Sequence, residues 1–176
     1  MLVRVLLLLL VMIPGFIYAQ NSEEMKIYLD NKQVSKAAKD FYSGKFKATD
    51  NDKTLSIIDS LRTKNSFTRP FYLYLVSKMM DKSDGALSEA LGNSCKEFVE
   101  DSPNSAIEFL YQNNKIANHV TVDNWAKIIE GEFMIVCEND EKECVGKSLQ
   151  KTLLKTKAAN RSNVNDLYQR IKKYIH

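Results

Sequence analysis

Residues 85–101 read GALSEALGNSCKEFVED, and this stretch decides the fold class. Apolar or small residues recur in pairs every four positions, at 86–87, 90–91, 94–95 and 98–99, with polar residues and one glycine between them. This rhythm places the pairs along one face of an α-helix, and the two-residue alternation of a β-strand does not produce it. The stretch therefore predicts a long amphipathic helix.

The flanking segments carry the same kind of signal. Ser102 and Pro103 are typical of the N-cap and the first position of a following helix. Upstream, Thr68 and Pro70 mark the start of FYLYLVSKMM, which is apolar almost all round and therefore predicts a helix covered on most sides. Apolar stripes with helical spacing also occur at residues 34–42, 55–61, 122–136, 145–153 and 164–175.

Together these stripes predict an all-α protein, a single domain of about seven or eight helices without a convincing strand. Glycine and proline are scarce after residue 20, which indicates short connections between the helices. Neighbouring helices with short connections pack antiparallel, so we expect either an antiparallel bundle or stacked helical hairpins in a HEAT-like arrangement. The sequence shows no regular repeat of about 33 to 47 residues, so a solenoid is not demonstrated.

The N-terminus has the features of a secretory signal peptide. Arg4 is the only charge among the first twenty residues, and an apolar run over 5–13 follows it and ends at Pro14. The run covers about half of the roughly 20 residues that a membrane-spanning helix needs. We therefore expect removal of residues 1–19 and export of an all-helical domain over 20–176, to the periplasm or the exterior, without a transmembrane segment after cleavage.

Charge is distributed in blocks along the chain. Residues 20–80 carry a net charge of +4, residues 81–144 carry −9, and residues 145–176 carry +7. Such asymmetry indicates an interaction, and its first candidate partner is the protein itself. The sequence predicts that the basic C-terminal helices lie against the acidic middle of the chain.

No motif for catalysis appears, and the chain is predicted not to be an enzyme. Cys95 lies in the apolar stripe of its helix, where cysteine is usually an inert small hydrophobe, so a dyad with His119 is disfavoured. The nucleophile motif G-x-S-x-G is absent. Glu130 and Glu132 are two residues apart on a predicted helix, point to different faces, and are expected to be solvated rather than to flank a glycosidic bond.

Metal and phosphate sites are not indicated either, and we predict no cofactor. The cysteines lack the close Cys and His spacing of zinc sites. The acidic stretch around residues 138–143 lacks the residue order and the turn glycine of an EF-hand. No glycine-rich phosphate loop occurs.

The segment CENDEKEC, residues 137–144, predicts a disulfide. Export places the three cysteines of the chain in an oxidising compartment. Seven residues along a continuous helix span about 10.5 Å, whereas a disulfide tolerates at most about 7 Å between Cα atoms, so pairing of Cys137 with Cys144 requires a turn between them. The apolar stripe stops at Cys137 and resumes at Val145, which agrees with such a turn. Closing this loop contributes about 2.5 kcal/mol in the chain-entropy model.

These observations favour an exported helical module that binds another protein of the cell envelope or exterior through a charged helical surface. The segment 137–144 marks the switch from the acidic to the basic block, so we look for a functional surface beside it. One alternative is binding to a membrane surface or an anionic polymer through the basic C-terminal helices, with Arg170, Lys172 and Lys173 as the candidate contacts. Another is a small hydrolase without a recognisable motif. Export argues against nucleic acid as a partner.

Overall fold

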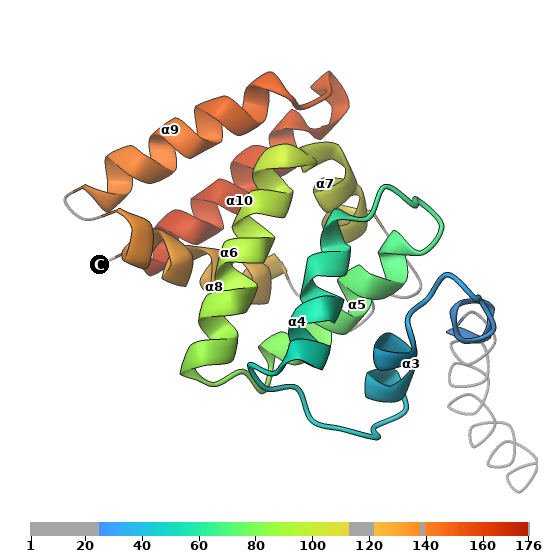
Figure 1. Ribbon diagram of the computed structural model, residues 1–176. Coiled ribbons are helices and arrows are strands. Elements are labelled where there is room, and N and C mark those ends of the chain that lie inside the picture. Colours follow the sequence, from blue (N-terminus) through green and yellow to red (C-terminus); the bar gives the residue numbers. More distant parts are fainter. Residues whose placement is uncertain (1–24, 113–121, 138–139, 176) are drawn as a thin grey trace, which may run out of the picture.

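The computed structural model describes residues 25–112, 122–137 and 140–175 (Figure 1). Regular structure in these ranges is helical throughout, which confirms the all-α prediction. A helical turn at 25–29 comes first. The helices that follow are α3 (Lys36–Tyr42), α4 (Asp52–Asp59), η1 (Ser60–Arg62), α5 (Arg69–Met80), α6 (Gly85–Asp101), α7 (Pro103–Tyr111), α8 (Val122–Val136), α9 (Glu141–Leu154), η3 (Ala158–Asn160) and α10 (Arg161–Tyr174). The predicted signal peptide, residues 1–19, lies outside the described residues.

Short polar side chains begin several of these helices. Asn51, Asp84 and Asp140 each accept a hydrogen bond from the backbone N–H three residues further on, at the starts of α4, α6 and α9. Such a side chain satisfies one of the backbone donors that a helix leaves unpaired at its N-terminus. Ser102 and Thr68, the predicted N-caps of α7 and α5, stand in the N-cap position without a side-chain bond, and a proline is the first residue of α7 and the second of α5.

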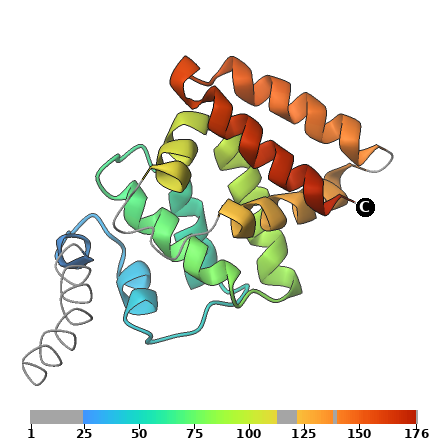
Figure 2. The same cartoon turned by 180° about the vertical axis from the view of Figure 1, so that it is seen from behind.

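The helices form a bundle in which α6 holds a central position. It packs most extensively against α8 and also contacts α4, α5, α7 and α9. The helices α9 and α10 lie side by side on one flank of the bundle, whereas α3 and the turn before it lie on the opposite flank (Figures 1 and 2). The bundle is therefore the alternative that the structure supports.

The core is formed by the predicted apolar stripes. Phe71, Trp125, Phe133 and Tyr168 are among its largest buried side chains. The indole Nε1 of Trp125 donates a hydrogen bond of 2.8 Å to the hydroxyl of Ser77, which links α8 to α5 inside the core. A buried tryptophan needs such a partner for its N–H group. The nearly apolar helix α5 is covered on most sides, as its sequence predicted.

The approach of α6 to α8 is close enough to require glycine at position 92. A Cβ atom built on Gly92 would lie 3.0 Å from the backbone oxygen of Ile128 and 3.1 Å from the Cβ atom of Glu132. A backbone oxygen cannot move aside as a flexible side chain can. Any larger residue at this position therefore pushes the two helices apart.

Two expectations for α8 are wrong. Val136 was expected to continue the core stripe, but 48% of its surface is exposed. Glu130 and Glu132 were expected to be solvated, but each is only 7% exposed. The contact at Gly92 brings the middle of α8 against α6 and covers Glu132, whereas the last three residues of the helix stay exposed.

Substitution of alanine at two glycines tests this packing. Gly92→Ala and Gly146→Ala both replace a helical glycine, and both gain about 1 kcal/mol of helix propensity. A Cβ atom at Gly146 meets nothing within 4 Å. We expect Gly92→Ala to be about 1 to 3 kcal/mol less stable than Gly146→Ala in urea unfolding, because only the first must displace backbone. Equal stabilisation of both variants would contradict the close contact.

Candidate functional site

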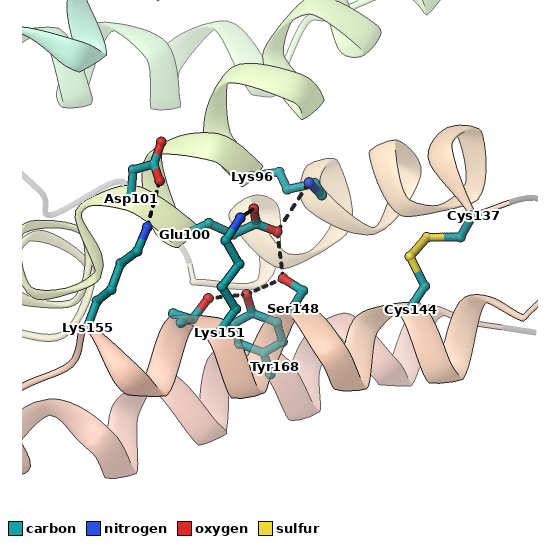
Figure 3. Close-up of polar contacts among 10 residues, drawn as sticks. Lys96, Glu100, Asp101, Cys137, Cys144, Ser148, Lys151, Lys155 and Tyr168 are labelled. Carbon is teal, nitrogen blue, oxygen red and sulfur yellow. Dashed lines mark hydrogen bonds and ion pairs between the residues drawn. A yellow bond between two sulfur atoms is a disulfide. The ribbon is translucent and has the colours of Figure 1, made fainter.

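A turn brings the ends of α8 and α9 together at the cysteine pair. Cys137 and Cys144 lie at disulfide distance, with 6.2 Å between their Cα atoms (Figure 3). The backbone N–H of Cys137 still donates to Phe133, and that of Cys144 to Asp140, so both cysteines continue the hydrogen bonding of their helices. The pair thus connects two helix ends directly, as the interrupted stripe predicted.

The last three residues of α8 form an exposed apolar surface, which we call the α8 tip. Met134, Ile135 and Val136 are 59%, 55% and 48% exposed. Consecutive residues on a helix point about 100° apart, so the three side chains span about 200° of the helix surface, and the last turn of α8 packs on the bundle through its remaining side, with Phe133 and Cys137. Contiguous exposed apolar residues are the surface feature that most often marks an interaction site.

Acidic residues at the start of α9 adjoin the α8 tip. Asp140 caps the helix, and Glu143 forms an ion pair of 2.6 Å with Lys147. One carboxylate oxygen of Glu141, Oε1, is buried and has no hydrogen-bond partner among the described residues. Carboxylates are stabilised near the N-terminal end of a helix dipole. This end of α9 therefore presents negative charge beside an apolar surface.

A buried polar network fixes α9 and α10 to α6 (Figure 3). The hydroxyl of Ser148 donates to Oε1 of Glu100 at 2.6 Å and lies 2.7 Å from the hydroxyl of Tyr168, which is 2.8 Å from that of Thr152. Ser148 has a single proton and donates it to Glu100, so Tyr168 donates to Ser148 and accepts from Thr152. Burial raises the pKa of Tyr168. The hydrogen bonds thus run from Thr152 through Tyr168 and Ser148 to the carboxylate of Glu100.

Two lysines balance the charge of Glu100, which is only 8% exposed. The Nζ atom of Lys96 lies 3.2 Å from Oε1, and the Nζ atom of Lys151 lies 3.6 Å from Oε2. Lys96 also lies over the ring of Phe133, 5.4 Å from its centroid. A buried carboxylate is tolerated when it is paired and hydrogen-bonded in this way. The network therefore holds the helices in place, and its serine is too buried to meet a substrate.

Other basic residues of the C-terminal helices also pair with the acidic middle of the chain. Lys155 lies 2.8 Å from Asp101, and Lys157 lies 3.9 Å from Glu108. These contacts confirm that the basic block lies against the acidic one. Much of the charge contrast in the sequence is thus paired between helices of the protein, in ion pairs at its surface.

Arg170, one of the three predicted anion contacts, is held by two aspartates. Its Nε atom donates to Asp166 at 2.7 Å and its Nη1 atom to Asp123 at 2.9 Å. The hydroxyl of Tyr111 donates to Asp166 at 2.8 Å, and the bond from Arg170 lowers the pKa of that carboxyl. Lys172 is half-buried and Lys173 is exposed, both in the last turn of α10. Contact of these three residues with an anion stays a prediction.

Cys95, Glu130 and Glu132, the described residues that were considered for catalysis, are all buried. Cys95 is fully buried, and burial raises the pKa of its thiol, which disfavours the reactive thiolate. His119 lies outside the described residues. Burial also raises the pKa of Glu132, although the positive charge of Lys96 opposes the shift. In the part of the chain that the structure describes, no three His, Cys, Asp or Glu side chains could hold a metal ion.

Comparison with models of protein families, with curated proteins and with solved structures found no match to this chain. Among the described residues, no helix combines the length and the apolar character needed to cross a bilayer. The function has to be inferred from the geometry of the chain itself.

Removal of one hydroxyl tests the buried network. We expect Tyr168→Phe to lower the free energy of unfolding by about 1 to 2 kcal/mol, because Ser148 loses its donor and Thr152 its acceptor. Tyr174→Phe in the same helix is the matched control, since its hydroxyl has no bond to a described residue. Urea unfolding followed by circular dichroism measures both variants, and equal stability of the two would contradict the role of the network.

Peptide mapping without reductant tests the cysteine pairing. In protein recovered after export, we expect one peptide pair that links Cys137 to Cys144, with Cys95 alkylated only after unfolding because it is buried. A linkage through Cys95, or alkylation of all three thiols in the folded protein, would contradict the pairing.

Proposed function

We propose that the protein is an exported helical module that binds another protein of the cell envelope or exterior through the α8 tip. The single observation that carries the proposal is the exposure of Met134, Ile135 and Val136, which are consecutive and about half exposed. In a chain that buries most of its large apolar side chains, such a cluster is the feature that a partner would cover. The cysteine pair beside it limits the movement of this helix end.

The charges beside the α8 tip indicate the chemistry of the partner. Asp140 and Glu143 are exposed at the start of α9, and Glu141 has a carboxylate oxygen without a hydrogen-bond partner among the described residues. An apolar centre with an acidic border fits a partner segment that is apolar and flanked by Lys or Arg. The sequence predicted a charged interaction surface. We place this surface at the start of α9, beside the α8 tip, because much of the remaining charge forms ion pairs within the protein.

Export is supported by the apolar leader in the sequence and by the two cysteines at disulfide distance. Disulfides persist in oxidising compartments and are rare in reducing ones. The hydrolase alternative has less support, because the hydroxyl, thiol and carboxyl groups with unusual surroundings are buried in the core. We therefore propose a binding role without enzymatic activity.

Site-specific photo-cross-linking in the native envelope tests this proposal. A benzophenone side chain would replace Ile135 in the α8 tip, or Leu154, which is 86% exposed at the far end of α9, as the matched control. We expect an adduct from position 135 alone, attached within an apolar segment of the partner that carries neighbouring Lys or Arg. Excess unlabelled chain should compete for the adduct, and chain with Ile135→Asp should not.

Two outcomes would contradict the proposal. Equal labelling from positions 135 and 154 would indicate contact by collision rather than a site. An adduct formed by the purified chain alone would show that the α8 tip is covered by a second copy of the same protein.

A further inference from the structure

Two segments far apart in the sequence form a second exposed surface, which we call the N-terminal face. It consists of residues 25–33 and 63–68. The amide Nδ2 of Asn65 donates a hydrogen bond of 2.8 Å to Oε1 of Gln33, and the rings of Tyr28 and Phe67 lie 5.9 Å apart. Tyr28 also stacks on the core residue Phe71 at 5.2 Å. The face is thus attached to the bundle on its inner side.

The outer side of this face carries apolar side chains among lysines. Ile27 is 56% exposed and directly precedes Tyr28 in the sequence. Phe67 is 54% exposed, and its ring lies 5.9 Å from that of Tyr28. They belong to the small set of large apolar residues that the fold leaves exposed. A bilayer interface accepts such side chains together with the apolar stems of nearby lysines.

The charge of the N-terminal face is positive. Lys26, Lys32 and Lys64 are exposed and form no ion pair with any described residue, unlike Lys147 and Lys151 of α9. Asp30 is the only acidic residue in 25–33 and 63–68. Arg69 follows directly and adds a further positive charge, because its guanidinium binds a backbone oxygen and a serine hydroxyl rather than a carboxylate.

In the sequence, this face follows the predicted export leader. Residue 25 belongs to the face, and the apolar run 5–13 precedes it by about a dozen residues, a reach of at most about 40 Å. Glu23 and Glu24 lie in this connection and offset two of the positive charges, so that with Arg69 included a single net positive charge remains. While the leader is inserted during export, the N-terminal face is therefore the part of the described fold that the chain holds closest to the bilayer.

We propose that the N-terminal face contacts the headgroup region of membranes that contain anionic phospholipids. Ile27 and Phe67 insert among the headgroups, and the three lysines bind the negative surface. This site lies on the opposite flank of the bundle from the α8 tip, so both surfaces can be occupied at once (Figures 1 and 2). The proposal relies on export of the chain but not on the partner site, and the two can fail separately.

Co-sedimentation with vesicles tests this contact. The chain from residue 20 onward would be mixed with vesicles of phosphatidylcholine alone or of phosphatidylcholine with phosphatidylglycerol. We expect binding to the mixed vesicles that weakens as salt is added. Replacement of Lys26, Lys32 and Lys64 by Gln should reduce that binding at least about tenfold. Ile27→Asp and Phe67→Asp should reduce it as well, and both change side chains that are about half exposed.

The matched control is the double variant Lys172→Gln with Lys173→Gln, which removes basic residues of α10 and should bind as the unchanged chain does. Loss of binding in this variant alone would move the membrane contact to the C-terminal helix and overturn the proposal. Absence of binding to both kinds of vesicle, or equal binding to neutral and anionic vesicles, would overturn it as well.

Discussion

The close contact of α6 with α8 at Gly92 is the constraint on which most of the bundle depends. It brings the middle of α8 against the central helix. There Trp125 donates a hydrogen bond to Ser77 of α5, and the ammonium group of Lys96 lies over the ring of Phe133. The last turn of α8 keeps one side against the bundle, through Phe133 and Cys137, and leaves the α8 tip exposed on the other.

Electrostatics in this protein act mainly between helices. Glu100 anchors α9 through Ser148 and Lys151, and Ser148 in turn bonds Tyr168 of α10. Asp123 and Asp166 neutralise Arg170 in a similar way on the other side of α10. Burial of Glu100 is tolerated because its carboxylate has lysine partners and a hydroxyl donor. The ion pairs of Arg170 are partly exposed, and the one with Asp123 links α10 to α8.

The sequence predicted the helices well because their apolar residues recur with the period of a helix. The stripe of 85–101 and the turn inside CENDEKEC both depend on local spacing, and both are present in the structure. Spacing could not predict that Glu130 is buried and Val136 exposed, because burial depends on how far the neighbouring helices extend. Nor could it predict a network whose members are 48 and 20 residues apart in the chain. The hydroxyls of Ser148 and Thr152, four residues apart in a helix that faces the core, were the one available signal.

The burial of Cys95 has a consequence for the way the protein is oxidised. A chain with three cysteines can form three different pairs, and two of them would join distant parts of the bundle incorrectly. Once α6 has packed into the core, the sulfur of Cys95 is out of reach of any oxidant or thiol in solution. The remaining cysteines are seven residues apart and already adjacent. In an oxidising compartment, a chain whose α6 has already packed would therefore need an oxidant but no disulfide isomerase, since the buried Cys95 cannot enter an incorrect pair.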